Sequence, residues 1–198
     1  MKISVIIPCY NEEQTILKVI RSVQESLKED EYEIIIVDDA SIDDSKKLIE
    51  KYSRNDRNIE IISHEHNSGK GSAIRTGFNS ATGDLVVIQD ADLEYDPSEF
   101  GKLFKPIQDG KADVVYGSRF KSGDAVRVLY YWHRMGNVFL TWLSNMFTNL
   151  NLTDMETCYK VFRKEVLDQI KIEENRFGFE PEITAKIAKI RPRIRTYE

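Results

Sequence analysis

The stretch Asp84-Leu85-Val86-Val87-Ile88-Gln89, followed at once by Asp90-Ala91-Asp92, decides how this chain is interpreted. Its continuous apolar run predicts a strand that is buried on both faces of a sheet. Residues i and i+2 of an extended chain point to the same side, so Asp90 and Asp92 are expected to converge on one cation at the end of the strand. Glu94 joins them if the chain stays extended. Carboxylate oxygens suit Mg2+ or Mn2+, so the pattern is compatible with a divalent-metal site. The simpler interpretation is a solvated acidic loop.

Similar apolar runs recur along the first 117 residues and alternate with segments of helical spacing. Strands are expected at 3–8, 32–37, 59–63, 84–89 and 112–116. This alternation predicts an α/β fold with right-handed βαβ units and a mostly parallel central sheet that has helices on both faces. Ligands of such sheets bind beyond the carboxyl ends of the strands. Polar clusters follow the expected strands at 8–12, 38–41, 90–94 and 117–119, so a binding crevice is predicted at that edge.

The composition is that of a soluble globular protein. The 198 residues are 41% hydrophobic and 31% charged, which favours one domain with a substantial core. A formal net charge of -5 argues against a nucleic-acid partner. The N-terminus has no signal-peptide pattern, and no apolar run reaches the roughly 18 to 20 residues that span a bilayer. We therefore expect a cytoplasmic location, which includes the cytoplasmic face of a membrane.

Residues 126–152 are rich in large apolar side chains and predict one or two helices. Two alternatives stay open for them: packing beneath the edge of the sheet, or facing a membrane interface or a lipid-like acceptor. The histidines show no zinc-ligand spacing, and His64 and His66 are expected on the surface.

Several nucleotide-binding motifs are missing, which narrows the chemistry. The chain has neither a Gly-x-Gly-x-x-Gly fingerprint nor a phosphate loop, and Asn67-Ser68-Gly69-Lys70-Gly71 is interpreted as a turn into a helix with Lys70 at its rim. Acidic clusters and arginines together suit a nucleoside diphosphate as a leaving group held by a cation. Asp38 and Asp39 can accept hydrogen bonds from a base or ribose, and Tyr10 can pack against a base.

An ordered set of motifs closely resembles the family 2 glycosyltransferases with the GT-A fold. The motifs lie at 5–13, 37–41, 69–71, 90–92 and 117–119. Segments 154–162 and 176–182 resemble the branch that contains dolichol-phosphate mannose synthases and polyprenyl-phosphate glycosyltransferases. The resemblance implies one GT-A catalytic domain over 1–198, with a nucleotide-binding half (1–118) and an acceptor-side half (119–198). Relatives continue past this segment, so the acceptor-side half is expected to be truncated.

The resemblance also assigns roles to individual residues. The residues implied to bind the nucleotide are Pro8, Tyr10, Asn11, Glu12, Asp38, Asp39, Ser41, Lys70 and Ala91. Asp90 and Asp92 match the metal-binding motif, and Glu94 stands where many relatives have glutamine. The residues implied to be catalytic are Asp92, Arg119, Arg134 and Asp154. Lys160 and Glu180 are assigned to the acceptor side.

The implied reaction is inverting transfer of a hexose from a nucleotide sugar, of the GDP-mannose or UDP-glucose type, to a polyprenyl or dolichyl phosphate. Mg2+ or Mn2+ is the implied cofactor, and peripheral membrane contact is compatible with such an acceptor. A sugar hydroxyl in polysaccharide or cell-envelope synthesis is the alternative acceptor, and it would need Asp154 or Glu180 as a base. Alternatives from other classes are a receiver-like regulatory module, a sugar nucleotidyltransferase and a non-catalytic nucleotide-binding protein.

Overall fold

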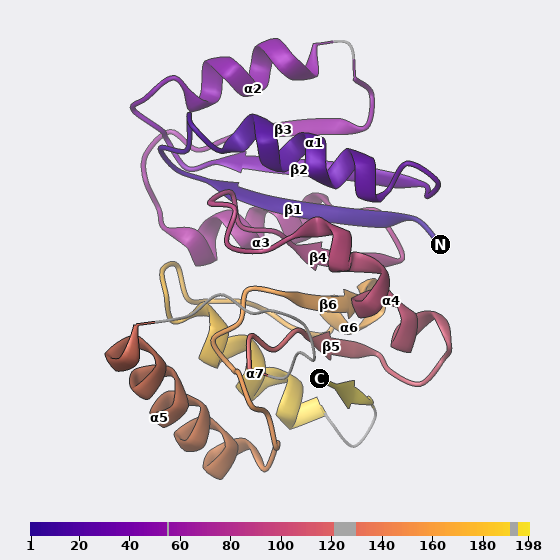
Figure 1. The fold of residues 1–198 in the computed structure, drawn as a ribbon, viewed down its shortest axis with the longest axis vertical. Coiled ribbons are helices and arrows are strands. Elements are labelled where there is room, and N and C mark those ends of the chain that lie inside the picture. The colour runs from indigo at the N-terminus through magenta and orange to yellow at the C-terminus, as the bar shows by residue number, and fades with distance from the viewer. Residues whose placement is uncertain (55, 121–129, 191–193) are drawn as a thin grey trace.

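One mixed sheet organises the fold, which is seen in a computed structural model that describes residues 1–54, 56–120, 130–190 and 194–198 (Figure 1). Within these ranges the strand order is β3-β2-β1-β4-β6-β5-β7. The strands are β1 (Ile3–Cys9), β2 (Tyr32–Asp38), β3 (Ile59–Ser63), β4 (Leu85–Ile88), β5 (Val114–Tyr116), β6 (Lys160–Arg163) and β7 (Thr196–Tyr197). The helices are α1 (Ile16–Ser26), α2 (Ser45–Ser53), α3 (Lys70–Ser80), the 3-10 helix η1 (Pro97–Glu99), α4 (Phe100–Gln108), α5 (Tyr131–Thr148), α6 (Lys164–Leu167) and α7 (Phe179–Ile190).

The N-terminal part of the sheet is parallel, which confirms the predicted α/β class. β1 pairs with β2 and β4, and β2 pairs with β3, all in parallel. The sequence pattern did not indicate β6, a short strand with a charged residue at each end, which inserts antiparallel between β4 and β5. Both predicted halves of the chain therefore contribute to one sheet, and the carboxyl ends of β1, β2 and β4 share one edge.

Two apolar layers cover the sheet because side chains along a strand alternate between its faces. In β1, Val5 and Ile7 pack with α1, α2 and α4 on one face, whereas Ile6 packs with α3, α6 and α7 on the other. All three side chains are fully buried. Burial of this kind contributes about 25 cal/mol per Å2 of apolar surface. The sheet is thus a firm base that leaves the polar residues of its edge available for binding.

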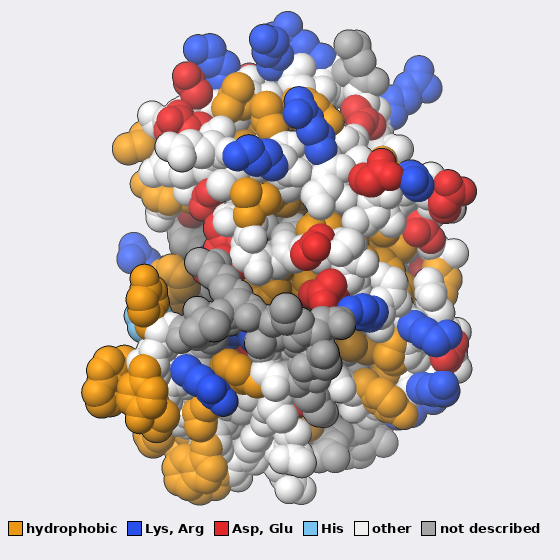
Figure 2. Space-filling model, in the orientation of Figure 1, with side chains coloured by type: hydrophobic (Ala, Val, Ile, Leu, Met, Phe, Trp, Pro, Cys, Tyr) orange, Lys and Arg blue, Asp and Glu red, His pale blue; other side chains and the backbone are white. Residues whose placement is uncertain are grey.

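α5 differs from the other long helices because most of it is exposed. It lies to one side of the sheet (Figure 1), where it contacts α7, and Thr141 is its one buried residue. The hydrophobic side chains at the lower left of Figure 2 gather over this helix. Of the two alternatives left open for residues 126–152, packing beneath the sheet edge does not describe α5, although Leu150 and Leu152 just beyond it are buried in the core. Residues 126–129 lie outside the described ranges. Among the described helices, none has both the length and the apolar character needed to cross a bilayer.

Candidate functional site

A cavity of about 420 Å3 opens at the sheet edge where β1 and β4 end. Its lining combines the segments that follow these strands with the start of α3 and the loop before α7. The lining residues are Pro8, Cys9, Tyr10, Glu12, Asp39, Asn67, Gly69, Lys70, Ala73, Asp90, Ala91, Asp92, Arg176 and Phe177. Eight residues of the predicted nucleotide and metal sites are among them: Pro8, Tyr10, Glu12, Asp39, Lys70, Asp90, Ala91 and Asp92.

The chain turns sharply just beyond three of the strands. Asn11 (φ 58°), Ala40 (φ 61°) and Leu93 (φ 64°) have left-handed backbone conformations after β1, β2 and β4. For residues with a Cβ atom this conformation costs about 1–2 kcal/mol, and such strain concentrates at functional sites. The turn at residues 91 and 92 already ends the extended conformation that would carry Glu94 to the side of Asp90. Glu94 is not part of the cavity lining.

Two carboxylates after β4 offer oxygen ligands to a divalent cation. Asp90 and Asp92 both line the cavity, and Asp92 accepts the N–H of Glu94 at 2.9 Å. Burial raises the pKa of the Asp92 carboxyl above its ordinary value, and the negative charges of Asp90 and Glu94 add to the rise. The described part of the chain contains no group of three His, Cys, Asp or Glu side chains placed to hold a metal. The donor set therefore fits an ion such as Mg2+ or Mn2+ that takes two protein carboxylates and completes its shell with phosphate and water oxygens.

Lys70 brings a positive charge directly to these carboxylates. Its Nζ lies 2.9 Å from Oδ1 of Asp90 and 3.5 Å from Oε1 of Glu180, and its side chain is 22% exposed. Burial alone would lower the pKa of Lys70, but the surrounding negative groups, including Asp90 and Glu180, raise it well above its ordinary value. Lys70 is therefore charged and lies between two carboxylates, not at an open rim as the sequence suggested.

Asp39 is tied to the loop that precedes α3. Its carboxylate accepts the N–H groups of Ser68 at 2.9 Å and Gly69 at 2.7 Å, and Oδ1 lies 2.6 Å from Nδ1 of His64. Nε2 of His64 lies 2.9 Å from the Thr76 hydroxyl. The expectation that His64 is a surface residue is therefore wrong. Its partners lie 25 and 12 residues away in the sequence, so no local pattern indicated them.

Three residues predicted to bind the nucleotide connect loops instead. Asp38 is buried, and its Oδ1 accepts the N–H of Ser41 at 3.4 Å. The Ser41 hydroxyl accepts the N–H of Asn11 at 3.0 Å, and the Asn11 side chain accepts the N–H of Ile42 at 2.9 Å. These bonds join the loop after β1 to the loop after β2. Asn11, Asp38 and Ser41 lie outside the cavity lining, and their predicted contact with the nucleotide stays a prediction.

The glycines on either side of Lys70 permit a close approach between distant segments. A Cβ atom on Gly69 would lie 2.5 Å from the carbonyl oxygen of Asn175, and one on Gly71 would lie 2.6 Å from that of Glu174. Gly69 also has φ +96°, a conformation that favours glycine. The turn at 69–71 thus lets the backbone of the loop before α7 pack directly against the start of α3.

This contact brings Arg176 and Phe177 into the cavity lining, and sequence reasoning did not assign either of them. The Ser72 N–H donates to the Asn175 carbonyl at 3.0 Å, and the Arg75 guanidinium donates to the Asn175 side chain at 2.8 Å. The one available signal was the family-like segment 176–182. That segment did not reveal which part of the N-terminal half it would contact.

Arg119 and Asp154 form an ion pair in which the carboxylate is buried and the guanidinium is partly buried. Nε of Arg119 donates to Oδ2 at 2.6 Å and Nη2 donates to Oδ1 at 2.7 Å, while the Arg119 N–H also donates to Oδ2 at 3.1 Å. Asp154 is 0% exposed, and its hydrogen bonds raise the pKa of Arg119 above its ordinary value. A carboxylate held in this way is not available as a base. In the structure Asp154 holds Arg119 in place, and its predicted catalytic role stays a prediction.

The two predicted arginines lie close together. The guanidinium carbons of Arg119 and Arg134 lie 5.8 Å and 5.6 Å from the ring centre of Phe120. Neither arginine lines the cavity. Lys121 and Arg127, which stand between the two arginines in the sequence, fall outside the described residues.

Lys160 and Glu180, the two residues predicted for the acceptor side, are both buried. Lys160 in β6 is 0% exposed, donates to the carbonyl of Thr157 and has its Nζ 5.4 Å from the ring centre of Tyr116. Burial lowers the pKa of Lys160 below its ordinary value. Its strand lies inside the sheet, so its side chain points into the interior. Glu180, in the first turn of α7, is occupied by Lys70.

This sheet, with a pocket of paired aspartates at its edge, has the architecture of the GT-A glycosyltransferases. Glucosyl-3-phosphoglycerate synthase from Mycobacterium tuberculosis, crystallised with Mn2+, UDP and phosphoglyceric acid, matches 99% of this chain with a TM-score of 0.75 and 22% identity. The match covers 67% of that protein. Staphylococcus aureus TarS 1-349 matches 100% of this chain with a TM-score of 0.68 and 25% identity, over 58% of its own length.

The chain belongs to glycosyltransferase family 2. The family model described as "Glycosyl transferase family 2" matches residues 4–171. Undecaprenyl-phosphate 4-deoxy-4-formamido-L-arabinose transferase from Proteus mirabilis is 31% identical over 95% of this chain, and dolichol-phosphate mannosyltransferase from Pyrococcus furiosus is 30% identical over 90%. The chain spans 57% and 50% of the lengths of these two relatives.

Proposed function

We propose that this protein transfers a hexose, with inversion, from a nucleotide sugar of the GDP-mannose or UDP-glucose type to a polyprenyl or dolichyl phosphate. The observation that carries the proposal is the cavity in which Asp90 and Asp92 lie beside Tyr10 and Glu12 at the strand ends. Support for the acceptor comes from the two relatives, whose names specify undecaprenyl phosphate and dolichol phosphate.

The donor side follows from the chemistry of the lining. Tyr10 offers an exposed ring against which a base can pack. Asp90 and Asp92 would hold a divalent ion, which offsets the charge that builds on the diphosphate as its bond to the sugar breaks. Lys70 and Arg176 add positive charge from the chain itself and suit phosphate oxygens.

A phosphate acceptor fits the acceptor side better than a sugar hydroxyl. A phosphate monoester has its second pKa near 6, so it is already a nucleophilic anion and needs to be positioned more than activated. A hydroxyl needs a carboxylate base, and the two predicted candidates are engaged, Asp154 by Arg119 and Glu180 by Lys70. The hydroxyl reaction would have to use another carboxyl such as Glu156, whose pKa burial raises above its ordinary value.

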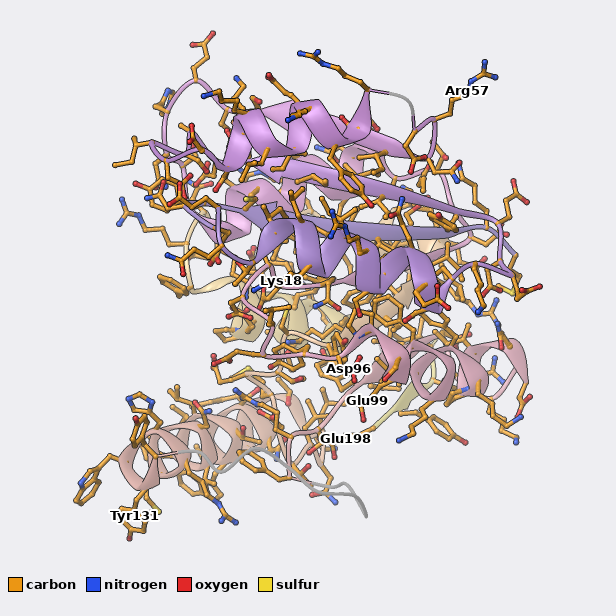
Figure 3. All side chains as sticks on the ribbon, turned by 45° about the horizontal axis from the view of Figure 1, so that its top comes forward. Lys18, Arg57, Asp96, Glu99, Tyr131 and Glu198 are labelled. Carbon is orange, nitrogen blue, oxygen red and sulfur yellow. The ribbon has the colours of Figure 1, made fainter. Side chains whose placement is uncertain are left out.

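α5 is the surface proposed to contact the membrane that carries such an acceptor. Exposed large side chains recur along it at alternating spacings of three and four residues: Trp132, Met135, Phe139, Trp142 and Met146. This spacing keeps them on one side of the helix. Figure 3 shows Tyr131 at the outer end of the same helix. The helix contains Arg134 and no acidic residue, and aromatic rings with a basic residue suit an anionic lipid interface.

Thermal unfolding with a panel of nucleotide sugars tests the proposed donor. GDP-mannose, UDP-glucose and UDP-N-acetylglucosamine are each added with Mn2+ or with EDTA. A ligand at 100 times its Kd stabilises the fold by about 2.7 kcal/mol, so we expect one of them to raise the unfolding temperature only with Mn2+. That donor should then glycosylate undecaprenyl phosphate. The proposal is contradicted if the nucleotide sugar stabilises the protein equally in EDTA, or if no nucleotide sugar stabilises it. Release of pyrophosphate from a nucleoside triphosphate would indicate a nucleotidyltransferase.

A further inference from the structure

Lys70 contacts a carboxylate that the proposed function assigns to a divalent ion. Its Nζ lies 2.9 Å from one oxygen of Asp90 and 3.0 Å from the other. Both oxygens of the first aspartate in the Asp-x-Asp pair are therefore within hydrogen-bond distance of one ammonium group. A metal ion that used Asp90 would have to share these oxygens with Lys70 or displace it.

The backbone of Lys70 is fixed while its side chain has an alternative partner. Gly69 and Gly71 pack closely against the backbone of Asn175 and Glu174, and the Ser72 N–H donates to the Asn175 carbonyl, so the start of α3 is tied to this loop. The lysine side chain is flexible, and Glu180 lies 3.5 Å from its Nζ on the side of α7. Lys70 can consequently leave Asp90 without leaving its place in the fold and without losing every carboxylate partner.

The charges that line the cavity indicate when the Lys70 ammonium would leave Asp90. Glu12, Asp39, Asp90 and Asp92 line it with negative charge, and Lys70 and Arg176 line it with positive charge. A divalent ion alone would repel the neighbouring ammonium. A diphosphate would attract both the ion and the ammonium, because each can bind its oxygens.

We infer that Lys70 is a positioning residue that competes with the divalent ion for Asp90 until the donor diphosphate gives its ammonium group another partner. The inference rests on the proposed metal site and extends it to the order of binding. Metal binds weakly to the free protein and tightly when the diphosphate is present. Because such coupling is reciprocal, the ion strengthens diphosphate binding by the same factor.

The affinity of the protein for Mn2+ alone tests this inference without any turnover. Titration calorimetry and the electron paramagnetic resonance signal of free Mn2+ both measure that affinity. We expect Lys70→Met, and Lys70→Gln as a second neutral variant, to bind Mn2+ about tenfold more tightly than the wild type, a change that corresponds to about 1.4 kcal/mol. Lys70→Arg keeps the charge and should stay close to the wild type. In both neutral variants the gain in Mn2+ affinity on adding UDP or GDP should shrink by a similar factor.

A gain in metal affinity separates this role from a structural one, since a damaged site binds metal less tightly. Unchanged or weaker Mn2+ binding in both neutral variants would overturn the inference, as would an equal gain in Lys70→Arg. Asp92→Asn distinguishes the two proposals. If that variant loses Mn2+ binding while the Lys70 variants bind like the wild type, only the role of Lys70 fails. If Asp92→Asn binds Mn2+ like the wild type, the proposed metal site fails and the Lys70 inference fails with it.

Discussion

The two ends of the central sheet both carry acidic side chains, yet their surroundings are opposite. At the amino ends of β1 and β2, the Glu33 carboxylate accepts hydrogen bonds from the Ser4 hydroxyl at 2.6 Å and from the N–H and hydroxyl of Thr82 at 2.7 Å and 2.8 Å, and it is paired with Lys2. Burial opposes the charge of Glu33, but these donors lower its pKa to about 2. At the carboxyl ends, burial and neighbouring acids raise the pKa of Asp92.

This contrast separates a structural carboxylate from one that is prepared for a ligand. Glu33 is surrounded by donors from its own chain, so it stabilises the fold as it stands. Asp92 lies among other acids on a cavity wall, where an added cation would relieve the repulsion. The end of the sheet where binding is proposed is thus the end at which the charge of an acidic side chain is disfavoured in the protein without ligand.

Asp92→Asn should have the largest functional effect. We expect Mn2+-dependent binding of the nucleotide sugar to be lost, because one of two protein ligands is removed. The free energy of unfolding without ligand should stay the same or rise by up to about 1 kcal/mol, since a repelled charge is gone. Calorimetry and urea unfolding measure the two quantities. If the variant binds the donor normally, or unfolds much more easily, Asp92 is not a ligand-binding carboxylate that differs from the structural carboxylate of Glu33.

Arg119→Met tests a residue that lies near the carboxyl ends of the strands and is paired with the buried Asp154. The substitution leaves the buried carboxylate of Asp154 without its guanidinium, which costs about 3 kcal/mol in urea unfolding. Replacing both residues, as in Arg119→Met with Asp154→Leu, should restore much of that loss. Transfer activity of the restored protein then reports on the predicted phosphate contact of Arg119. A fully stable single variant would show that the ion pair contributes little.

Glu33→Gln tests the structural end of the sheet. A carboxyl with a folded pKa of about 2 and an ordinary value of 4.5 stabilises the fold above pH 4.5, and this contribution disappears as the pH falls from 4.5 toward 2. We expect the variant to be less stable by about 2 kcal/mol at pH 7 and to approach the wild type near pH 2. Urea unfolding across this range measures the difference. A difference that does not change with pH would contradict the role given to the charge, and Mn2+-dependent donor binding should be unaffected.

Trp142→Ser should have the smallest effect on stability, within about 0.5 kcal/mol, because Trp142 is 58% exposed. The same variant, combined with Phe139→Ser, should weaken sedimentation with vesicles of phosphatidylcholine and phosphatidylglycerol. Tyr197→Ser, at an exposed aromatic residue of β7, is the matched control. Unchanged vesicle binding in the double variant would remove α5 as the membrane contact.

The parallel part of the fold was predictable from the sequence because each strand there is rich in apolar residues. Ile3–Cys9 and Tyr32–Asp38 each extend one residue beyond the expected segments. β6 was not predictable in this way, since Lys160-Val161-Phe162-Arg163 has two apolar residues and gains its place only by pairing with β4 and β5.

The site was predictable where one segment carries all of its chemistry and not where distant segments meet. The sequence grouped Asp90 with Asp92 because they stand two residues apart in one segment, and both line the cavity. It missed Phe177 and the partner of His64, since these contacts depend on packing across the fold. It also could not show that Asp154 and Lys160 are fully buried, because burial is a property of the folded chain and not of a motif.

The most direct test of the proposed donor site is anomalous diffraction at the manganese edge from crystals soaked with Mn2+ and the donor that the unfolding assay selects. We predict one strong peak at the carboxyl ends of β1 and β4, about 2.1 Å from a carboxylate oxygen of Asp92 and from oxygens of the diphosphate. A diphosphate bound with Asp90 and Asp92 turned away from it, or a peak elsewhere on the protein, would contradict the account.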